Sequence, residues 1–508
     1  MLLINSSPQN ALKIFQPFLP IFVPIGLGCL AAACREQGVP VNFIDEQVEQ
    51  DVFAAVAHGT KDMSQPYIFG FSVLTAAMKQ AIVVSKKIKA RYPDSIILFG
   101  GIHPTANPEE VLSFPHIDLV LRGEAEQTLI ELYRHIKAGQ DYSHLAGLSY
   151  RNGVQICHTP PSCDLVDLDT MPPFPYELFT NPRYNRGFVI SSRGCPYNCI
   201  FCSNRIVTGK RYRYVSEEVI VSALELLYHK YGQTFVVFID DNFLVSKKRI
   251  YNLLELIKNK GLHKKMSFSF QARGDNVDYH LLKELYEGGF KSVFFGIETA
   301  SEEIMKIVDK GETVQQCVDA VIMAKNIGFH VSATFIFGLP TETHADRLQA
   351  IRLARRLPLD QVRFNNATPY PGTELYNIAQ RENRLHIEGL YENFLSVGTF
   401  IENPVKKTPF SYVPPGNNEE EIRSDILFAY LCFYLDPKKL EAIFTKPKQG
   451  AGWFNSGESL KQFLKKIPSL GFLFMMLTIK FSQFLWNILR KQNTQISLRQ
   501  VWHALTER

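Results

Sequence analysis

The chain contains, between Phe188 and Cys202, the stretch FVISSRGCPYNCIFC. Its first residues form a short apolar run of the kind that predicts a buried strand. Three cysteines follow at the spacing CxxxCxxC, namely Cys195, Cys199 and Cys202. Thiolates are soft ligands that suit iron–sulfur clusters, and three of them can hold three irons of a [4Fe–4S] cluster. The fourth iron would then stay open to an external ligand.

Two other interpretations of these cysteines are a zinc knuckle with a distant fourth ligand and a set of buried structural thiols. The spacing alone allows both. The cysteines, however, follow the first strand of a longer series of strands and helices. Functional residues of such folds sit in the loops at the C-terminal ends of the strands, which favours the cluster.

The series of strands and helices extends from residue 187 to about 380. Six apolar stretches predict strands at Phe188–Ser192, Phe235–Ile239, Met266–Gln271, Ser292–Phe295, Val331–Phe337 and Val362–Asn366. Helical patterns fill the gaps, as at Ser216–Tyr231, Ser246–Lys258 and Asp278–Glu287. Six such units predict a partial (β/α)6 barrel over residues 184–385.

Residues 1–140 show a second α/β pattern. Its expected strands are Leu2–Asn5, Val41–Ile44, Tyr67–Ser72, Ile96–Phe99 and Leu119–Leu121, with helices near Gly26–Gln37, Ala76–Arg91 and Gln127–Ala138. Strands that alternate with helices predict a parallel sheet covered on both faces, here a flavodoxin-like doubly wound domain. Such sheets bind ligands at the C-terminal ends of their strands.

The other three stretches of the chain lack this alternation of strands and helices. Six prolines between residues 158 and 183 exclude a long helix there, so residues 141–183 are predicted to be a Pro-rich linker. Residues 386–458 are predicted to be a mostly helical, substrate-side region that includes a helix at Glu419–Phe433. Residues 459–508 form a basic tail with eight basic residues and one acidic residue.

Composition excludes several classes of protein. The 508 residues are 46% apolar and 21% charged, an ordinary globular balance that fits about three domains. Nine cysteines, an odd number spread along the chain, do not form a secreted disulfide framework. No signal peptide is predicted, and we expect a protein of the reducing cytoplasm. The net charge of +5 lies in the tail, so the body has no basic surplus for nucleic acid.

The tail has two interpretations that the sequence leaves open. Leu470–Ile479 is almost wholly apolar but is shorter than the ~20 residues that span a bilayer. The tail could be an amphipathic helix on a membrane, which would make the protein peripheral to the inner face of that membrane. It could equally be a terminal helix pair docked on the protein's own core.

The cysteine motif, with the aromatic Phe201 before the last cysteine, resembles that of the radical S-adenosylmethionine (SAM) superfamily. This resemblance implies a [4Fe–4S] cluster whose open iron is chelated by the amino and carboxylate groups of SAM. It also implies a reductant, such as flavodoxin or ferredoxin, and cleavage of SAM to a 5′-deoxyadenosyl radical. That radical would abstract a hydrogen atom from a small-molecule substrate.

Residues at the ends of later strands fit the same resemblance. Asp240 or Asp241, between which the sequence does not choose, would contact the amino group of SAM. Glu298 would contact its ribose, and Gly338 would let the backbone approach its adenine. Arg273, at the end of the third strand, could face the cavity. A helix cap at Asp241 and a rim salt bridge at Glu298 are the alternative interpretations.

Three loops of the first domain, SVLT at 72–75, GGIHPT at 100–105 and RGEAE at 122–126, resemble the cobalamin-binding domain of one large radical SAM subfamily. The residues that would contact cobalamin are Ser72, Leu74, Gly100, Gly101, His103, Gly123 and Glu124. Classical cobalamin domains carry a DxHxxG loop after the first strand, whose histidine binds cobalt, and Asn5 is followed here by no such loop. We therefore expect cobalamin without a histidine ligand, and His103 as a hydrogen-bonded loop residue.

This subfamily implies two catalytic functions. The first is cobalamin-dependent methylation of an unactivated carbon in a hydrophobic substrate. The second keeps the cofactors but oxidises or cyclises the substrate, as the anaerobic Mg-protoporphyrin IX monomethyl ester cyclase does, or modifies a hopanoid-like lipid without methyl transfer. A non-catalytic sensor is disfavoured by the intact cysteines. A methylthiotransferase is disfavoured because that class needs three further cysteines, and only Cys29 and Cys34 lie in the first domain.

Overall fold

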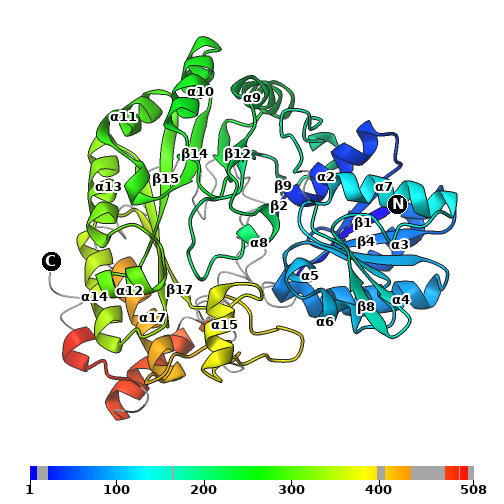
Figure 1. Ribbon diagram of the computed structural model, residues 1–508. Coiled ribbons are helices and arrows are strands. Elements are labelled where there is room, and N and C mark those ends of the chain that lie inside the picture. Colours follow the sequence, from blue (N-terminus) through cyan, green and yellow to red (C-terminus); the bar gives the residue numbers. More distant parts are fainter. Residues whose placement is uncertain are drawn as a thin grey trace.

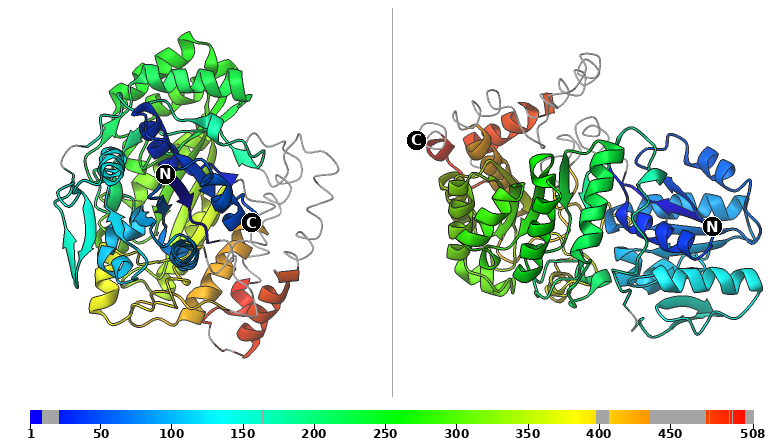
Figure 2. Two further views of the ribbon diagram at one scale, coloured as in Figure 1. Left: turned by 90° about the vertical axis from the view of Figure 1, so that its right-hand side faces the viewer. Right: turned by 90° about the horizontal axis from the view of Figure 1, so that it is seen from above.

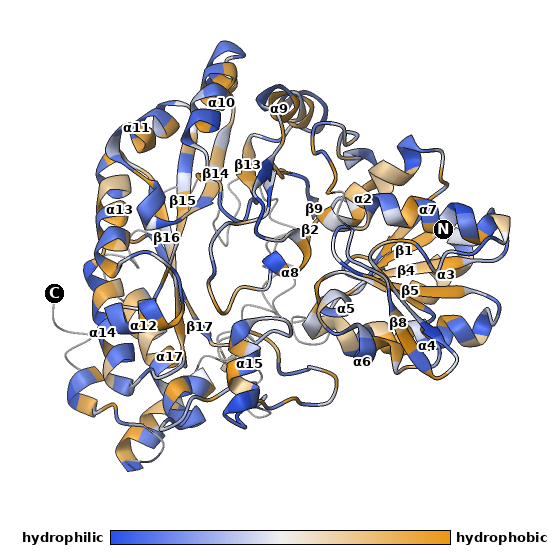
Figure 3. Ribbon diagram, viewed as in Figure 1, coloured by the Kyte–Doolittle hydropathy of each residue, from blue (hydrophilic) through white to orange (hydrophobic). Residues whose placement is uncertain are grey.

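The computed structural model describes residues 1–8, 21–162, 165–397, 407–435, 475–476, 478–490, 492 and 494–501. Two α/β bodies lie side by side, the N-terminal one in blue and cyan and the larger one in green and yellow (Figure 1). Apolar residues concentrate on the strands, and polar residues on the outer faces of the helices (Figure 3). Cys163 and residues 459–474 of the predicted tail lie outside the described residues.

The first body is the expected flavodoxin-like domain. Its parallel strands are β1 (Leu2–Asn5), β3 (Asn42–Asp45), β4 (Ile68–Ser72), β5 (Ile96–Gly100) and β6 (Leu119–Leu121), in the spatial order β3-β1-β4-β5-β6. The covering helices are α2 (Ile25–Glu36), α3 (Val52–Gly59), α4 (Met78–Arg91), α5 (Ile102–Ala106), α6 (Pro108–Leu112) and α7 (Glu126–Ala138). Apolar side chains fill both faces of the sheet, which is why its strands are apolar throughout.

The first sheet continues beyond residue 140 as a hairpin that the sequence analysis did not predict. Strands β7 (Leu148–Asn152) and β8 (Gln155–His158) add to β6 in antiparallel fashion. Gly153, with φ of +62°, begins the two-residue turn between them, as glycine commonly does in tight hairpins. The prolines that marked a linker begin only at Pro160, so the stretch 141–158 belongs to the sheet.

The second body confirms the six β/α units. Its sheet has the order β10-β13-β14-β15-β16-β17, all parallel. The strands are β10 (Phe188–Val189), β13 (Phe235–Phe238), β14 (Ser267–Ala272), β15 (Phe290–Glu298), β16 (His330–Phe337) and β17 (Gln361–Asn366). The main outer helices are α9 (Glu217–Tyr231), α10 (Lys247–Asn259), α11 (Tyr279–Glu287), α13 (Val314–Ile327) and α14 (His344–Arg356). One buried apolar cluster unites the strands and these helices.

The C-terminal region is partly helical. Helix α17 (Glu419–Tyr434) matches the predicted helix and packs against α14 and β17. The described stretches 386–397 and 407–418 contain no helix, so the expectation of a mostly helical region holds only for α17. Residues 478–490 are helical, and Phe484 and Ile488 lie in the core of the barrel. These C-terminal helices lie beside the barrel, away from the first domain (Figure 2).

The position of Phe484 and Ile488 agrees with the docked-helix interpretation of the tail. The ring of Phe484 stacks on that of Phe428 in α17, with centroids 6.3 Å apart. Within the described part of the chain, no helix has the length and apolarity needed to cross a membrane.

Two contacts that are far apart in the sequence join the two bodies. Strand β2 (Ile21–Phe22) pairs with β9 (Tyr184–Asn185), and the Tyr184 hydroxyl donates a hydrogen bond of 2.8 Å to Asp45 Oδ2. Behind the barrel, Tyr391 and Phe394 enter the apolar core of the first domain. These contacts fix the two bodies at two separate places. Both bodies therefore form walls of the space between them.

Candidate functional site

A cavity of about 280 Å³ lies between the two bodies. Its walls come from the C-terminal ends of strands in both sheets. The first domain contributes Ser72, Gly100, Gly101, Gly123 and Glu124, and the barrel contributes Ile190, Ser192, Arg193, Ile239 and Asp241. Leucines of the first sheet and its helices form an apolar floor, among them Leu3, Leu27, Leu98 and Leu121. Ligands of parallel sheets bind at this edge, so the cavity is the candidate binding site.

The glycines of this cavity are required by its shape. Gly101 has φ of +100°, and a Cβ atom at this residue would lie 3.1 Å from both the backbone nitrogen and oxygen of Val73. Five of the seven residues predicted to contact cobalamin line the cavity. We call Gly100, Gly101 and Gly123 the glycine cradle. Together with the apolar leucines of the cavity, it can accept part of a bulky ligand such as cobalamin.

The other two predicted contacts, His103 and Leu74, lie outside the cavity wall. His103 is fully buried, and among the described residues neither ring nitrogen has a hydrogen-bond partner. Its ring packs edge-on against Tyr391, and burial lowers its pKa to about 4, so the ring is neutral. The expectation that His103 is hydrogen-bonded was wrong, because the side chain of Tyr391 packs against its ring. Leu74 is half exposed.

The three cysteines lie on one anchored loop. Cys195, Cys199 and Cys202 are unpaired and partly exposed. Between them, the Ile200 amide donates to Val308 O at 3.0 Å, and its carbonyl accepts from the Leu375 amide at 2.9 Å. Burial raises the pKa of all three thiols, that of Cys202 to about 11, so the free thiols are protonated at neutral pH. Three sulfur donors on one fixed loop fit an iron–sulfur cluster, which would ionise them.

Arg273 supports this loop from the end of β14. Its guanidinium lies 3.6 Å from the centroid of the Tyr197 ring and makes two hydrogen bonds of 2.9 Å to Asp275. Asn276 Nδ2 donates to the Tyr197 hydroxyl at 2.8 Å. Arg273 therefore positions the residue between the first two cysteines, and its own charge is already neutralised.

Glu298 lies buried at the end of β15 with an unusual backbone. Its φ is +67°, and the strand pairing shifts between Gly296 and Glu298. Its Oε1 contacts Lys310 Nζ at 3.2 Å, while its buried Oε2 has no hydrogen-bond partner within the described part of the chain. Burial raises the pKa of this carboxyl. A buried carboxylate oxygen without a donor fits a hydroxyl-bearing ligand such as the ribose of SAM.

The structure separates Asp240 from Asp241. Asp240 is buried and accepts hydrogen bonds of 2.7 Å from the amides of Ser191 and Ser192, so it fixes the backbone before the cysteine loop. Asp241 lines the cavity and accepts from Asn204 Nδ2 at 2.8 Å. Asp241 is thus the better placed of the two to reach a ligand.

Gly338 and Phe201 lie around the same end of the barrel. Gly338 follows β16 with φ of +84°, and its amide donates to Glu342 Oε2. Phe201 packs against a small apolar cluster that includes Ile200 and Val308. Both residues are where the resemblance places them, and their contacts with SAM stay predictions.

Comparisons with known proteins agree with this geometry. Residues 189–354 match the Radical SAM superfamily, and residues 15–133 match the B12 binding domain. An uncharacterized methyltransferase of Pyrococcus horikoshii is 36% identical over 423 residues, which cover 82% of this chain and 89% of that protein. The chain belongs to the radical SAM family with a B12-binding domain.

One further relative and one solved structure extend the comparison. The anaerobic magnesium-protoporphyrin IX monomethyl ester cyclase of Cereibacter sphaeroides is 24% identical over 443 residues, 85% of this chain and 69% of that protein. The cobalamin-dependent SAM radical enzyme OxsB, solved with aqua-cobalamin and SAM, has a TM-score of 0.68 at 17% identity. That likeness covers 99% of this chain and 82% of that one, and it shows the shared fold.

The expected class of enzyme and its cofactors are confirmed by this membership. The chain is a radical SAM enzyme, and its cofactors are a [4Fe–4S] cluster, SAM and cobalamin. The contacts expected of individual residues stay predictions that rest on the geometry above. The expected domain limits also stay predictions, apart from the stretch 141–158, which belongs to the first sheet.

Sequence reasoning missed Lys310 and Glu312 of the radical SAM barrel. Lys310 Nζ donates to Gly296 O at 2.8 Å and lies 3.2 Å from Glu312 Oε1. Glu312 Oε2 accepts from the Gly274 amide at 2.7 Å. Burial opposes the charge of Lys310, but Glu298 and Glu312 raise its pKa above the usual value. The KGET stretch at 310–313 was the available signal, yet nothing local indicates that its charges are buried.

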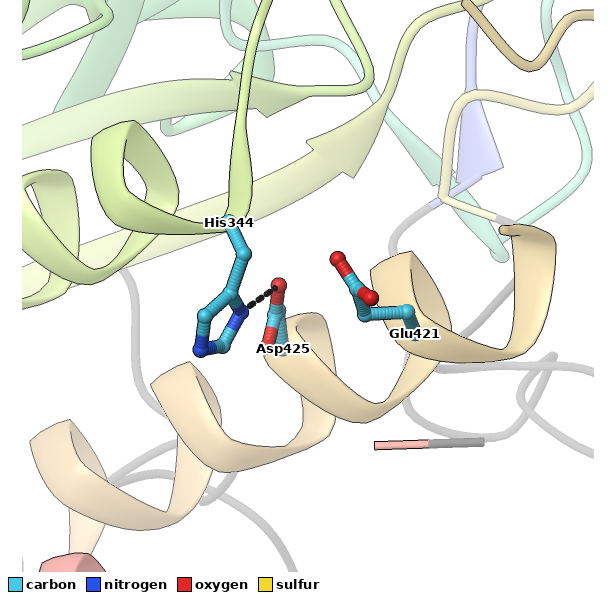
Figure 4. A group of neighbouring side chains, drawn as sticks. All are labelled: His344, Glu421 and Asp425. Atoms are coloured by element: carbon cyan, nitrogen blue, oxygen red, sulfur yellow. Dashed lines mark hydrogen bonds and ion pairs between the residues drawn. The ribbon is translucent and has the colours of Figure 1, made fainter. Parts of the chain in front are cut away.

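A second polar cluster lies on α14 and α17 and contains His344, Glu421 and Asp425 (Figure 4). Their ligand atoms lie close enough to hold a metal ion. Arg347, however, is fully buried beside them and contacts Asp425 Oδ2 at 2.5 Å and Glu421 Oε1 at 2.7 Å. The guanidinium pairs with both carboxylates, so the cluster already has a cation and joins the two helices.

Proposed function

We propose that this radical SAM enzyme transfers a methyl group to an unactivated carbon of a hydrophobic small molecule. The observation that carries the proposal is the cavity between the two bodies, whose walls combine the glycine cradle with the barrel residues around the cysteine loop. This arrangement supports a cobalamin site next to the loop that would carry the cluster. The methyltransferase name of the relative from Pyrococcus horikoshii supports the same reaction.

The roles of the chain's own residues follow from their positions. Cys195, Cys199 and Cys202 would hold the cluster, and the glycine cradle at Gly101 would hold cobalamin. With these groups bound, the cluster and SAM supply a carbon-centred radical, and cobalamin supplies methyl transfer. Glu298, Asp241 and Gly338 would orient SAM.

The orientation of SAM depends on both sides of the barrel mouth. Glu298 would accept hydrogen bonds from the ribose through its unpartnered oxygen, since Lys310 occupies the other one. Asp241 would accept from the amino group of SAM. Gly338 would lie against the adenine, since it follows β16 with a φ of +84°, a conformation that glycine adopts readily.

A hydrophobic substrate and a peripheral membrane contact are part of this proposal. In the helical stretch 478–490, Trp486 and Leu489 are exposed, and Arg490 lies over the Trp486 ring at 4.2 Å. An outward face of apolar and basic residues fits a lipid surface. Flotation with anionic phosphatidylglycerol vesicles tests the contact. Wild-type protein should float and Trp486→Ser should float less; equal recovery of both at the bottom would contradict it.

A second candidate function is oxidation and ring closure of the substrate. The relative from Cereibacter sphaeroides favours it, since the similarity extends over 85% of this chain. The two functions differ in their products. Incubation with SAM labelled in its methyl group separates them: a labelled product and S-adenosylhomocysteine support methyl transfer, whereas unlabelled oxidised product supports cyclisation. A small reductant protein, such as flavodoxin or ferredoxin, would supply the electron in either case.

A further inference from the structure

Two arginines face each other across the short ladder that closes the cysteine loop. Strand β11 (Ser192–Arg193) pairs with β12 (Arg213–Tyr214) in antiparallel fashion, and Arg193 is directly opposite Arg213. The three cysteines lie in the loop between these strands. Like charges directly opposite each other destabilise an antiparallel pair. The ladder therefore needs negative charge from elsewhere.

That negative charge comes from the B12-binding domain. Glu124 lies between the arginines, with Oε2 3.3 Å from Arg193 NH1 and 3.2 Å from Arg213 NH1, and its Oε1 also contacts Arg213. Glu126 Oε1 lies 2.8 Å from Arg193 NH2. All four side chains are at least 87% buried, so water does not screen the two positive charges. Two carboxylates of one domain thus neutralise two arginines of the other.

The same four-residue group, which we call the interdomain node, forms a wall of the cavity. Arg193, Glu124 and Glu126 line the cavity, and Arg213 lies behind them. Helix α8 (Arg205–Thr208), which follows the third cysteine, contributes Val207 and Thr208 to the same wall. The start of the cysteine loop and the helix that follows its third cysteine therefore both touch the space that a ligand of the first domain would fill.

We propose that the interdomain node couples occupation of the cavity by cobalamin to SAM binding at the cysteine loop, with Glu124 as the central positioning residue. The inference rests on the proposed function. Cobalamin in the cavity would fix the loop 122–126. Glu124 and Glu126 of this loop pair with the two arginines of the β11–β12 ladder. That ladder closes the loop that carries the cysteines. Cobalamin should then raise the affinity for SAM, and SAM should raise the affinity for cobalamin by the same factor.

The test measures SAM affinity by equilibrium dialysis on the reconstituted full-length protein, with and without cobalamin. In wild type we expect cobalamin to tighten SAM binding at least about fivefold, within the usual range of coupling between sites. Glu124→Gln keeps the shape of the side chain but leaves one arginine uncompensated, and its coupling should fall below about twofold. The matched control is Glu177→Gln, which removes an exposed ion pair with Arg35 and should couple like wild type.

A second variant covers the case in which Glu124→Gln fails to fold or to bind cobalamin. Arg213→Gln leaves the cavity wall intact, because Arg213 does not line it, but removes one half of the opposed pair. Full coupling in this variant would overturn the proposal, as would equal SAM affinity with and without cobalamin in wild type. A wild type that binds no cobalamin contradicts the proposed function itself, whereas bound cobalamin without coupling contradicts the node alone.

Discussion

Lys310 Nζ lies 3.2 Å from Glu298 Oε1 inside the barrel, and both side chains are almost wholly buried. A buried ion pair is costly unless further hydrogen bonds complete it. Lys310 obtains them from Gly296 O and Glu312, but Glu298 Oε2 obtains none from the described residues. The pair is therefore complete only when a donor group enters from the open end of the barrel.

The variant Glu298→Gln should weaken SAM binding without loss of iron. The charged hydrogen bond to a hydroxyl contributes about 1.5–3 kcal/mol, so the Kd for SAM should rise about 10- to 100-fold. Equilibrium dialysis of the reconstituted protein measures it. The control is Glu303→Gln, whose side chain is exposed on the first turn of α12 (Glu302–Ile307). Equal affinity in wild type and Glu298→Gln would exclude Glu298 as a SAM contact.

The variant Gly26→Leu should reduce cobalamin binding. Gly26 lies in the cavity wall on α2, and a Cβ atom added there meets no atom of the described residues within 4 Å. The helix can therefore accept leucine, whose larger side chain would occupy part of the cavity. With cobalamin supplied at a limiting concentration, the amount bound per chain, measured by its visible absorption, should fall at least about tenfold. The iron content should stay at the wild-type level. Undiminished cobalamin binding would place the ligand elsewhere.

Stability should decrease as pH rises from 6 to 9 because of Glu342. Burial raises the pKa of this carboxyl from 4.5 to about 8. Between those values the folded chain holds one proton more than the unfolded chain, so the free energy of unfolding falls by up to about 2–3 kcal/mol between pH 6 and 8. Glu342→Gln does not titrate and should flatten the curve. Urea unfolding at several pH values measures it; parallel curves for both proteins would contradict the assignment.

The variant Arg347→Met should destabilise the fold strongly. It leaves the buried Asp425 and Glu421 carboxylates without their cation, which typically costs about 3–5 kcal/mol. Arg381→Met breaks an exposed pair with Glu374 and should cost about 1 kcal/mol or less. Urea midpoints of the three proteins provide the comparison. If zinc restored Arg347→Met to wild-type stability, the cluster would be able to act as a metal site.

The parts of the site that sequence could predict are those whose chemistry is local. Three cysteines after a strand, and glycines at strand ends, have their meaning within a few residues. The node at Arg193 could not be predicted, because its partners Glu124 and Glu126 come from the other domain. Lys310 was missed for a different reason, since burial of a charge depends on the whole fold. The hairpin before Pro160 was missed because its two-residue turn, Gly153-Val154, offers a single glycine as a signal.

For His103, the sequence predicted the position of the loop but not the direction of the side chain. Its GGIHPT loop predicted a residue near the cofactor, and its glycines do line the cavity. The histidine itself turns under Tyr391, a residue 288 positions later in the chain. A local motif placed the loop correctly, but only the tertiary structure decides which of its side chains reach the cavity.

The most direct test of the central claim is anaerobic reconstitution with iron, sulfide and hydroxocobalamin, followed by reduction and addition of SAM. Bound cobalamin is measured by its visible spectrum and 5′-deoxyadenosine by chromatography. We expect wild type and the control Cys157→Ala to bind about one cobalamin per chain and form 5′-deoxyadenosine, and Cys199→Ala to bind cobalamin but form none. Formation of 5′-deoxyadenosine by Cys199→Ala, or its formation by a wild type that binds no cobalamin, would contradict the two-cofactor site.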